Sequence, residues 1–148
     1  MLLRAIKLGH VVRREDGIAG MEFALLAPLL ISLFFGLIDI SMAAYIRREA
    51  QAAAQAGVQF AIISGWEQAD IEAAVYASAR LQDPDVSVER VYGCPISTGI
   101  SFVAQGTACT GGGSAGTYVR VTVTPDYEPI LPFEGLSVGS ATAVVRIK

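Results

Sequence analysis

The sequence predicts an α+β protein in which one long N-terminal helix crosses a membrane and a small domain follows it. Three observations lead to this fold class. Apolar residues make up 53% of the chain and charged residues only 17%, whereas roughly a quarter of the residues of a typical soluble domain are charged. Residues 18–46 are almost entirely apolar. From residue 86 onward, apolar and polar residues alternate, as they do in half-buried strands.

The first segment, residues 1–17, is short and basic. Its Lys and Arg residues are Arg4, Lys7, Arg13 and Arg14. Two further arginines, Arg47 and Arg48, follow the apolar run directly. Because Lys and Arg concentrate on the cytoplasmic side of membrane proteins, we expect residues 1–17 to be a cytoplasmic leader. The rest of the chain would then lie outside the cytoplasm.

The apolar run has the length of a membrane helix. Its only charges are Glu22 and Asp39. A helix needs about 20 residues to cross a bilayer core of about 30 Å, so the whole run is long enough, and the uncharged stretch 23–38 alone is short. We expect Asp39 to mark the outer edge of the membrane. Pro28 interrupts the run, which membrane helices tolerate better than soluble ones.

The helical pattern continues beyond the membrane, because residues 50–56 are rich in alanine, a strong helix former. Small and apolar residues recur there at helical spacing and form one stripe: Ala53, Gly57, Phe60 and Ala61. We therefore expect one helix over residues 18–63 that spans the membrane in its first half. Residues 64–148 would form the extracytoplasmic domain.

This domain is predicted to combine one short helix with an antiparallel sheet. Ser64 and Glu67 have the spacing of a capping box, which predicts a second helix that ends near Leu81. Alternating patterns predict strands that begin at residue 86 and cover 118–124 and 140–147, and they leave a fourth strand open within 100–107. The proline-containing stretch 125–132 would connect two strands irregularly. The sheet would have three or four strands.

Composition argues against most enzyme classes. The chain has one histidine, His10, and two cysteines, which are too few for a zinc site or a histidine-based triad. It has neither a P-loop nor a G-x-G-x-x-G motif. A net charge of −3 gives no global attraction to nucleic acid. We therefore expect no enzyme activity, no cofactor, no metal and no nucleic-acid partner.

The two cysteines, Cys94 and Cys109, are candidates for a disulfide bond. Under the predicted topology both lie outside the cytoplasm, where disulfides persist. The alternative is two independent buried thiols. A C-x-x-C motif is absent, which argues against a catalytic redox role.

The most specific motif lies where the leader meets the apolar run. Gly17 precedes the first apolar residue, Ile18, and Glu22 follows the glycine at the fifth position. This arrangement resembles the class III leader of type IV-like pilins, which a prepilin peptidase cuts after a glycine. The whole stretch further resembles the TadE-like family of minor pseudopilins of the tight-adherence (Tad, or Flp) pilus, with its pattern G-x-x-x-x-E-F-A-L-x-x-P. Several C-terminal residues also resemble this family: Val121, Thr122, Val123, Tyr127, Pro129, Leu131, Pro132, Ala141, Thr142 and Ala143.

The resemblance implies a pilin-like fold and a role in pilus biogenesis, adhesion and biofilm formation. It implies cleavage between Gly17 and Ile18, and a docking role for Glu22, Phe23 and Pro28. In related pilins the glutamate pairs with the terminal amine of a neighbouring subunit. The implied partners are the prepilin peptidase, other pilins and minor pseudopilins, the inner-membrane assembly platform and the lipid bilayer. The protein would be single-pass in the inner membrane, or incorporated into an extracellular pilus. One departure is Ile18, where classical type IV pilins often have phenylalanine.

Two other interpretations remain open. A bitopic membrane protein with an external binding or scaffolding domain would keep its N-terminus intact. A secreted binding module would be cut by ordinary signal peptidase in the run of small residues after Arg48. The site of N-terminal processing separates these interpretations from a pseudopilin.

Overall fold

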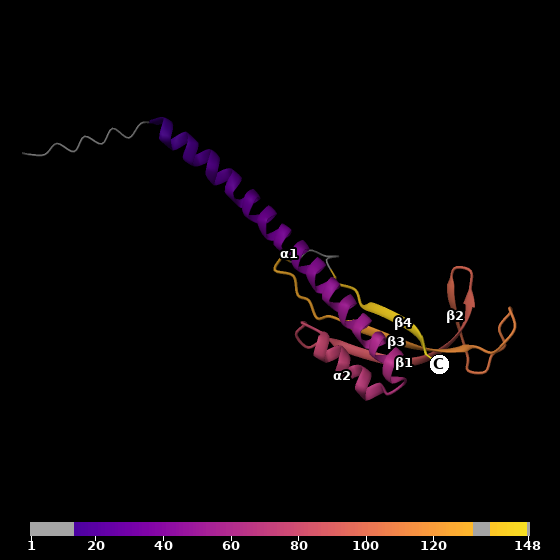
Figure 1. Ribbon diagram of the computed structural model, residues 1–148. Helices are drawn as coiled ribbons and strands as arrows, with labels where there is room; N and C mark the ends of the chain where they lie inside the picture. Colours follow the sequence, from indigo (N-terminus) through magenta and orange to yellow (C-terminus); the bar gives the residue numbers. More distant parts are fainter. Residues whose placement is uncertain (1–13, 132–136, 148) are drawn as a thin grey trace, which may run out of the picture. The chain divides into compact units, whose positions relative to one another are not determined.

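The computed structural model describes residues 14–131 and 137–147 and shows two helices and four strands (Figure 1). The elements are α1 (Arg14–Ser64), α2 (Gln68–Ser78), β1 (Asp85–Ile96), β2 (Gly99–Val103), β3 (Gly116–Thr124) and β4 (Ala141–Ile147). The predicted α+β class with a long apolar N-terminal helix is therefore confirmed. The strand left open within residues 100–107 exists as β2.

The chain divides into two compact units, Met1–Ile38 and Asp39–Lys148, and α1 contributes to both. In the first unit the large apolar side chains from Met21 to Leu37 are all exposed, from 38% for Phe35 to 76% for Leu25. Among the described residues, one helical stretch, Ala19–Ser64, is long and apolar enough to cross a membrane. A continuous exposed apolar surface of this kind needs lipid or other apolar helices around it.

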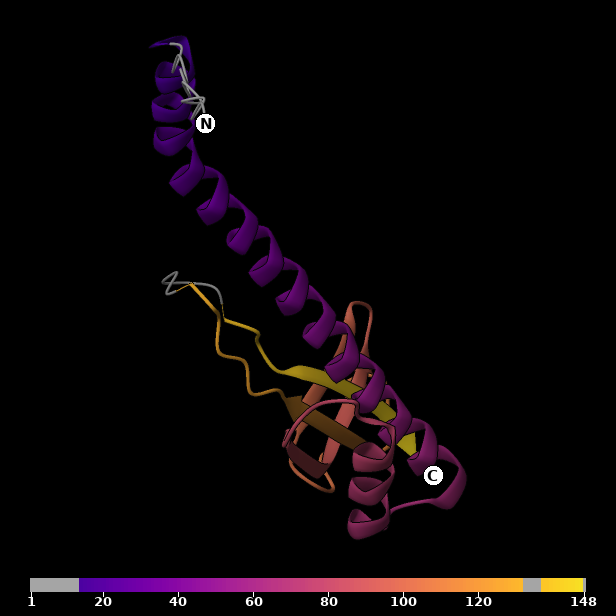
Figure 2. The same cartoon turned by 90° about the vertical axis from the view of Figure 1, so that its left-hand side faces the viewer.

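In the second unit the four strands form one antiparallel sheet in the order β2-β1-β3-β4. The strand β3 lies inside the sheet, with Val121 opposite Val88 of β1 on one side and opposite Ala143 of β4 on the other. Helix α2 and the C-terminal part of α1 lie on the same face of this sheet (Figure 2). The result is a two-layer arrangement of helices on a sheet.

The core of the second unit lies between these two layers. Three alternate valines of β3, Val119, Val121 and Val123, are fully buried on the helix-facing side of the sheet. The residues of α1 that share this core are small: Ala50, Ala53, Ala54, Val58 and Ala61. The predicted stripe therefore does face the core, with Phe60 half-buried against it. Ile71 and Val75 of α2 complete the cluster.

The predicted capping box is wrong. Ser64 is the last residue of α1, and Glu67 is the N-cap of α2, where its side chain makes no capping hydrogen bond. Gly65 has a φ of +82°, and its amide donates to the carbonyl of Ala61 at 3.0 Å. A glycine in this conformation is a common helix end, so Ser64 closes one helix and does not open the next. Helix α2 also ends at Ser78, before Leu81.

Gly57 allows α1 to lie close to its neighbours. A Cβ atom at this position would come within 2.5 Å of Cγ2 of Val75 and 3.3 Å of Cγ1 of Val121. Both valines are fully buried and cannot turn away into solvent. The glycine is therefore required by the packing of α1 against α2 and β3.

Gly57→Ala should lower the free energy of unfolding of the second unit by about 1–2 kcal/mol. Alanine gains about 1 kcal/mol of helix propensity over glycine, but overpacking a tight core costs about 1–3 kcal/mol, and two rigid valines leave little room for adjustment. Chemical unfolding followed by circular dichroism measures the difference. The matched control is Gly20→Ala in the same helix, where a Cβ atom meets nothing within 4 Å. A Gly57→Ala protein as stable as the wild type would show that the contact is not tight.

Candidate functional site

The predicted cleavage bond lies inside α1. The helix begins at Arg14, four residues before Ile18, so the backbone of both Gly17 and Ile18 is helical. The expectation that the helix starts at Ile18 is therefore wrong. The physical reason is that a single glycine costs a helix only about 1 kcal/mol and does not end it. Residues 1–13 of the predicted leader lie outside the described residues.

The three candidate docking residues lie on α1 but do not form one cluster. Glu22, Phe23 and Pro28 are all exposed. Successive residues of a helix point about 100° apart, so these three side chains point in different directions around α1. Glu22 makes no ion pair with any other residue in the described ranges 14–131 and 137–147.

Asp39 is the one charged residue of the described chain that is buried, with 1% of its surface exposed. Its carboxylate accepts two backbone hydrogen bonds, from the amide of Ile130 to Oδ1 and from the amide of Leu131 to Oδ2, both at 2.9 Å. The hydroxyl of Tyr127 donates to the backbone carbonyl of Asp39 at 3.0 Å and lies 3.4 Å from Oδ1. We call these contacts the Asp39 clamp.

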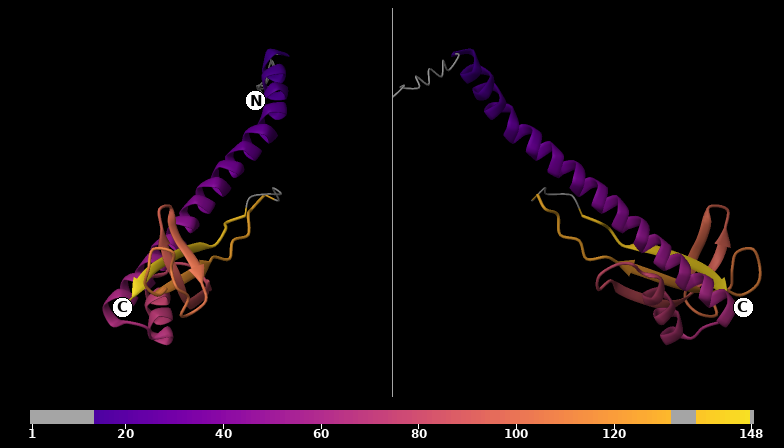
Figure 3. Two further views of the ribbon diagram at one scale, coloured as in Figure 1. Left: turned by 90° about the vertical axis from the view of Figure 1, so that its right-hand side faces the viewer. Right: turned by 60° about the vertical axis from the view of Figure 1, so that its left-hand side comes forward.

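The clamp holds the connection between β3 and β4 against α1. Residues 125–131 leave the sheet after β3, and residues 137–140 return beside them to β4 (Figure 3). Residues 132–136, among them the predicted connector residue Pro132, lie outside the described residues. Backbone amides in irregular chain need acceptors when they are buried. Asp39 supplies two of them from a helix that is 91 and 92 residues away in sequence.

The clamp holds a buried carboxylate, that of Asp39, with which no cation of the described residues pairs. A buried carboxylate is costly unless hydrogen bonds compensate it, and no salt bridge to Asp39 occurs among the described residues. Two amides and one phenol therefore carry the compensation. Burial raises the pKa of Tyr127 above 10.0, and the nearby carboxylate of Asp39 and its hydrogen bond raise it further.

From the sequence alone, we expect Asp39 only to mark the outer edge of the membrane. Its structural role was missed because the partners are distant in sequence and two of them are backbone amides. One signal was present, since the prolines of residues 125–132 predict an irregular connection between strands. That signal identified the connection without its partner on α1.

Cys94 and Cys109 form a disulfide in the structure, with their Cα atoms 5.6 Å apart. Cys94 is buried in β1, and Cys109 lies in the loop between β2 and β3. Two hydrogen bonds tighten this loop: the amide of Cys109 donates to Gly113, and the amide of Gly112 donates to Cys109. The bridge thus fastens a glycine-rich loop to the end of the sheet.

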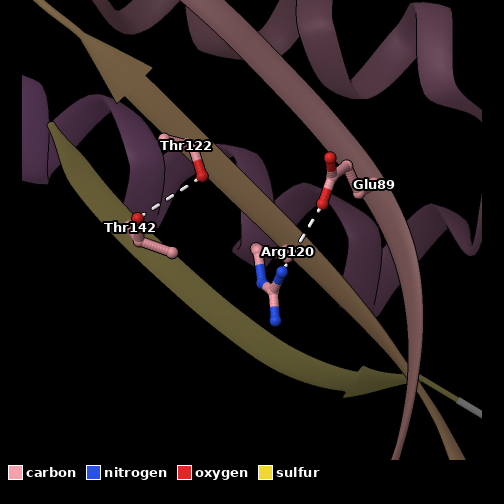
Figure 4. Close-up of polar contacts among 4 residues, drawn as sticks. All are labelled: Glu89, Arg120, Thr122 and Thr142. Carbon is pink, nitrogen blue, oxygen red and sulfur yellow. Dashed lines mark hydrogen bonds and ion pairs between the residues drawn. The ribbon is translucent and has the colours of Figure 1, made fainter. Parts of the chain in front are cut away.

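The sheet face opposite the helices is polar. Arg120 and Thr122 alternate with the core valines of β3 and therefore point away from the helices. Arg120 lies 3.5 Å from Glu89 of β1, and the hydroxyls of Thr122 and Thr142 lie 3.4 Å apart (Figure 4). The guanidinium of Arg120 also lies 4.3 Å from the ring centre of Phe102. This face suits polar contacts with another protein or with solvent.

Asp39→Ala should release the connection and destabilise the second unit by about 2–4 kcal/mol. Hydrogen bonds to a charged group are each worth about 1.5–3 kcal/mol, and this segment is partly exposed. Hydrogen exchange of the peptide that covers residues 125–131 should become fast. The control is Asp126→Ala, an exposed aspartate on the same connection that should change stability by less than about 0.5 kcal/mol. Unchanged protection in Asp39→Ala would refute the clamp.

Tyr127 should lose its proton at a higher pH than free tyrosine, because burial and the nearby carboxylate of Asp39 raise its pKa above 10.0. Its contribution to stability is complete below pH 10 and is lost as the pH rises through the pKa of the folded state. The measurement is the ultraviolet titration of phenolate in the wild type minus that in Tyr127→Phe. A midpoint of this difference at or below that of free tyrosine would contradict the contact with Asp39.

The disulfide should add about 3 kcal/mol to the free energy of unfolding, since the cysteines are 15 residues apart and a closed loop of this length loses that much entropy in the unfolded chain. Mass spectrometry of peptides without reduction should find Cys94 linked to Cys109. Replacing both with serine should lower stability by the same amount. Free thiols in protein isolated from the native envelope would overturn this prediction.

Comparison with known proteins gives one match. The family model described as TadE-like protein matches residues 17–59. No curated protein and no solved structure matches the chain. The matched segment begins at Gly17, includes Glu22, Phe23, Pro28 and Asp39, and ends within the part of α1 that packs on the sheet. The match confirms the resemblance over residues 17–59, and this segment is similar to the TadE-like proteins.

Proposed function

We propose that this protein is a minor pseudopilin, a structural and assembly subunit of a tight-adherence type IV-like pilus. In this proposal a prepilin peptidase cuts between Gly17 and Ile18, and the mature subunit packs with other pilins through α1. The protein is a substrate of the peptidase and not itself an enzyme. Its work is to support pilus biogenesis, and through it adhesion and biofilm formation.

The observation that carries the proposal is the family match that begins at Gly17 and has Glu22 at the fifth following position. The exposed apolar surface of residues 21–37 supports it, because this surface needs a lipid or protein environment. Small residues along the same stretch, such as Gly20 and Ala24, would let other helices approach closely. Lipid would surround α1 before assembly and sister helices would do so afterwards.

Cleavage would create a cationic partner for Glu22, which makes no ion pair within the described ranges 14–131 and 137–147. Once the leader is removed, the amine of Ile18 is a cation at the start of an apolar helix. Glu22 of a neighbouring subunit can pair with this amine and so neutralise both groups in an apolar setting. Removing one partner of a buried ion pair costs about 3–5 kcal/mol. In this proposal Glu22 is a docking residue that contributes little to the stability of the single subunit.

The remaining partners follow from the same proposal. Residues 39–148 would lie outside the cytoplasm and present surfaces to sister minor pseudopilins. The inner-membrane assembly platform would receive the subunit from the bilayer before its incorporation. The polar sheet face around Arg120 and Thr122 would serve contacts between subunits, because the core valines of β3 pack on α1 and α2 from the opposite face.

The test is the recovery of Glu22→Ala in isolated pili. The variant should reach the membrane in wild-type amounts, because one carboxylate less makes insertion easier. Its amount in sheared pili should fall at least tenfold, since each 1.4 kcal/mol of lost docking energy is a factor of about ten. Glu22→Gln separates the loss of charge from the loss of side-chain volume.

Glu67→Ala is the matched control, because Glu67 is an exposed glutamate outside the apolar segment and makes no capping bond. It should be incorporated like the wild type. Wild-type recovery of Glu22→Ala in pili would contradict the docking role. Absence of even the wild-type protein from pili, together with stable residence in the membrane, would favour the bitopic alternative with a binding or scaffolding domain.

A further inference from the structure

We propose that residues 125–131, which follow β3, are seated in the outer surface layer of the lipid bilayer, with the side chain of Ile130 inserted among the lipids and the Asp39 clamp holding it there. This inference rests on the proposed membrane anchoring of α1. It concerns a surface outside α1 itself and names a lipid bilayer as the partner of that surface.

The first step is the position of Asp39 along α1. Residues 40–46 after it carry no charge, and the next charges are Arg47 and Arg48. Ile40, Met42 and Tyr45 in this stretch are all exposed large side chains. The apolar surface of the helix therefore does not end at Asp39. It ends at two exposed arginines, which can reach the phosphates of a bilayer surface.

The second step is length. At 1.5 Å per residue, residues 23–38 give about 24 Å of helix, and residues 23–46 give about 36 Å. A bilayer core of about 30 Å is too thick for the first stretch and is spanned by the second with some tilt. The longer span requires Asp39 to lie within or beside the lipid, where a bare carboxylate is expensive. The clamp removes this obstacle, because the carboxylate is 1% exposed and accepts hydrogen bonds from its own chain.

The third step is the connection itself. Its backbone amides at Ile130 and Leu131 are bound to Asp39, so the segment stays at the level of this residue on α1. The side chain of Ile130 nevertheless remains 61% exposed. Irregular backbone is tolerated at membrane depth where protein groups satisfy it. Tyr127, with its hydroxyl on Asp39, is a residue type that is typical of the membrane interface.

The distribution of apolar side chains favours lipid over one docking helix. With about 100° between successive helix residues, Met42 and Tyr45 share one face of α1, whereas Ile40 points roughly 140–160° away from both of them. A single partner helix would need one stripe at spacings of three and four residues. A bilayer surrounds the helix and accepts apolar groups in all directions, including that of Ile130 on the adjacent connection.

The test is the depth of a spin label at Ile130→Cys in the full-length chain, reconstituted in vesicles of phosphatidylethanolamine and phosphatidylglycerol. The label is added without a reductant, so that the Cys94–Cys109 disulfide stays closed. Wild-type protein treated in the same way should take up no label, which verifies that the disulfide is intact. Two control variants carry the label at another added cysteine and give the values for a deep site and for an aqueous site. Leu29→Cys lies in the apolar span, and Tyr76→Cys is an exposed site on α2. Depth is measured by collisions with oxygen, which dissolves in lipid, against collisions with a water-soluble nickel chelate.

The label at Ile130 should show an oxygen-to-nickel collision ratio several-fold higher than the label at Tyr76 and lower than the label at Leu29. Adding Asp39→Ala should bring the Ile130 value to that of Tyr76. A label at Ile130 that behaves like the one at Tyr76, while Leu29 is deep, would overturn the inference and leave the membrane anchor intact. A deep Ile130 label that ignores Asp39→Ala would overturn the role of the clamp. An aqueous label at Leu29 would instead refute the anchoring on which the proposed function depends.

Discussion

The hydrogen bonding of Asp39 is the interaction that lets one helix serve two environments. Before this residue α1 exposes apolar side chains in every direction, and from Ala50 onward it buries a stripe of small ones in a core. A charged residue such as Asp39 would ordinarily mark the boundary between the exposed apolar part of α1 and the part that packs in the core. Here the carboxylate is covered by the connection between β3 and β4, so it becomes part of the fold of the second unit. The carboxylate is thereby compensated by groups of its own unit.

The second constraint is that the face of α1 that packs on the sheet carries small side chains. Alanine and glycine bring the backbone of α1 close to the valines of β3, and the room left beside it is taken by α2. This packing makes the C-terminal part of α1 an integral part of the second unit.

The sequence predicted the elements well and their junctions poorly. Periodicity identified the long helix, the alternating strands and the buried stripe, because each of these signals is local. The helix start at Arg14 was missed because a single glycine does not stop a helix. The end of α1 was misjudged because Ser64 and Glu67 fit a capping box by spacing alone, while the conformation of Gly65 decided the boundary. The Asp39 clamp was unpredictable from pattern, since it joins a helix to backbone amides about 90 residues away.

The proposal that α1 is the processed anchor of a pseudopilin can be decided by the N-terminal sequence of the mature protein. The protein should be purified from native cells with and without the prepilin peptidase. The mature chain should start at Ile18 when the peptidase is present and at Met1 when it is absent. An intact Met1 in both strains would contradict it and leave a bitopic anchor, and cleavage after Arg48 would contradict it in favour of a secreted module.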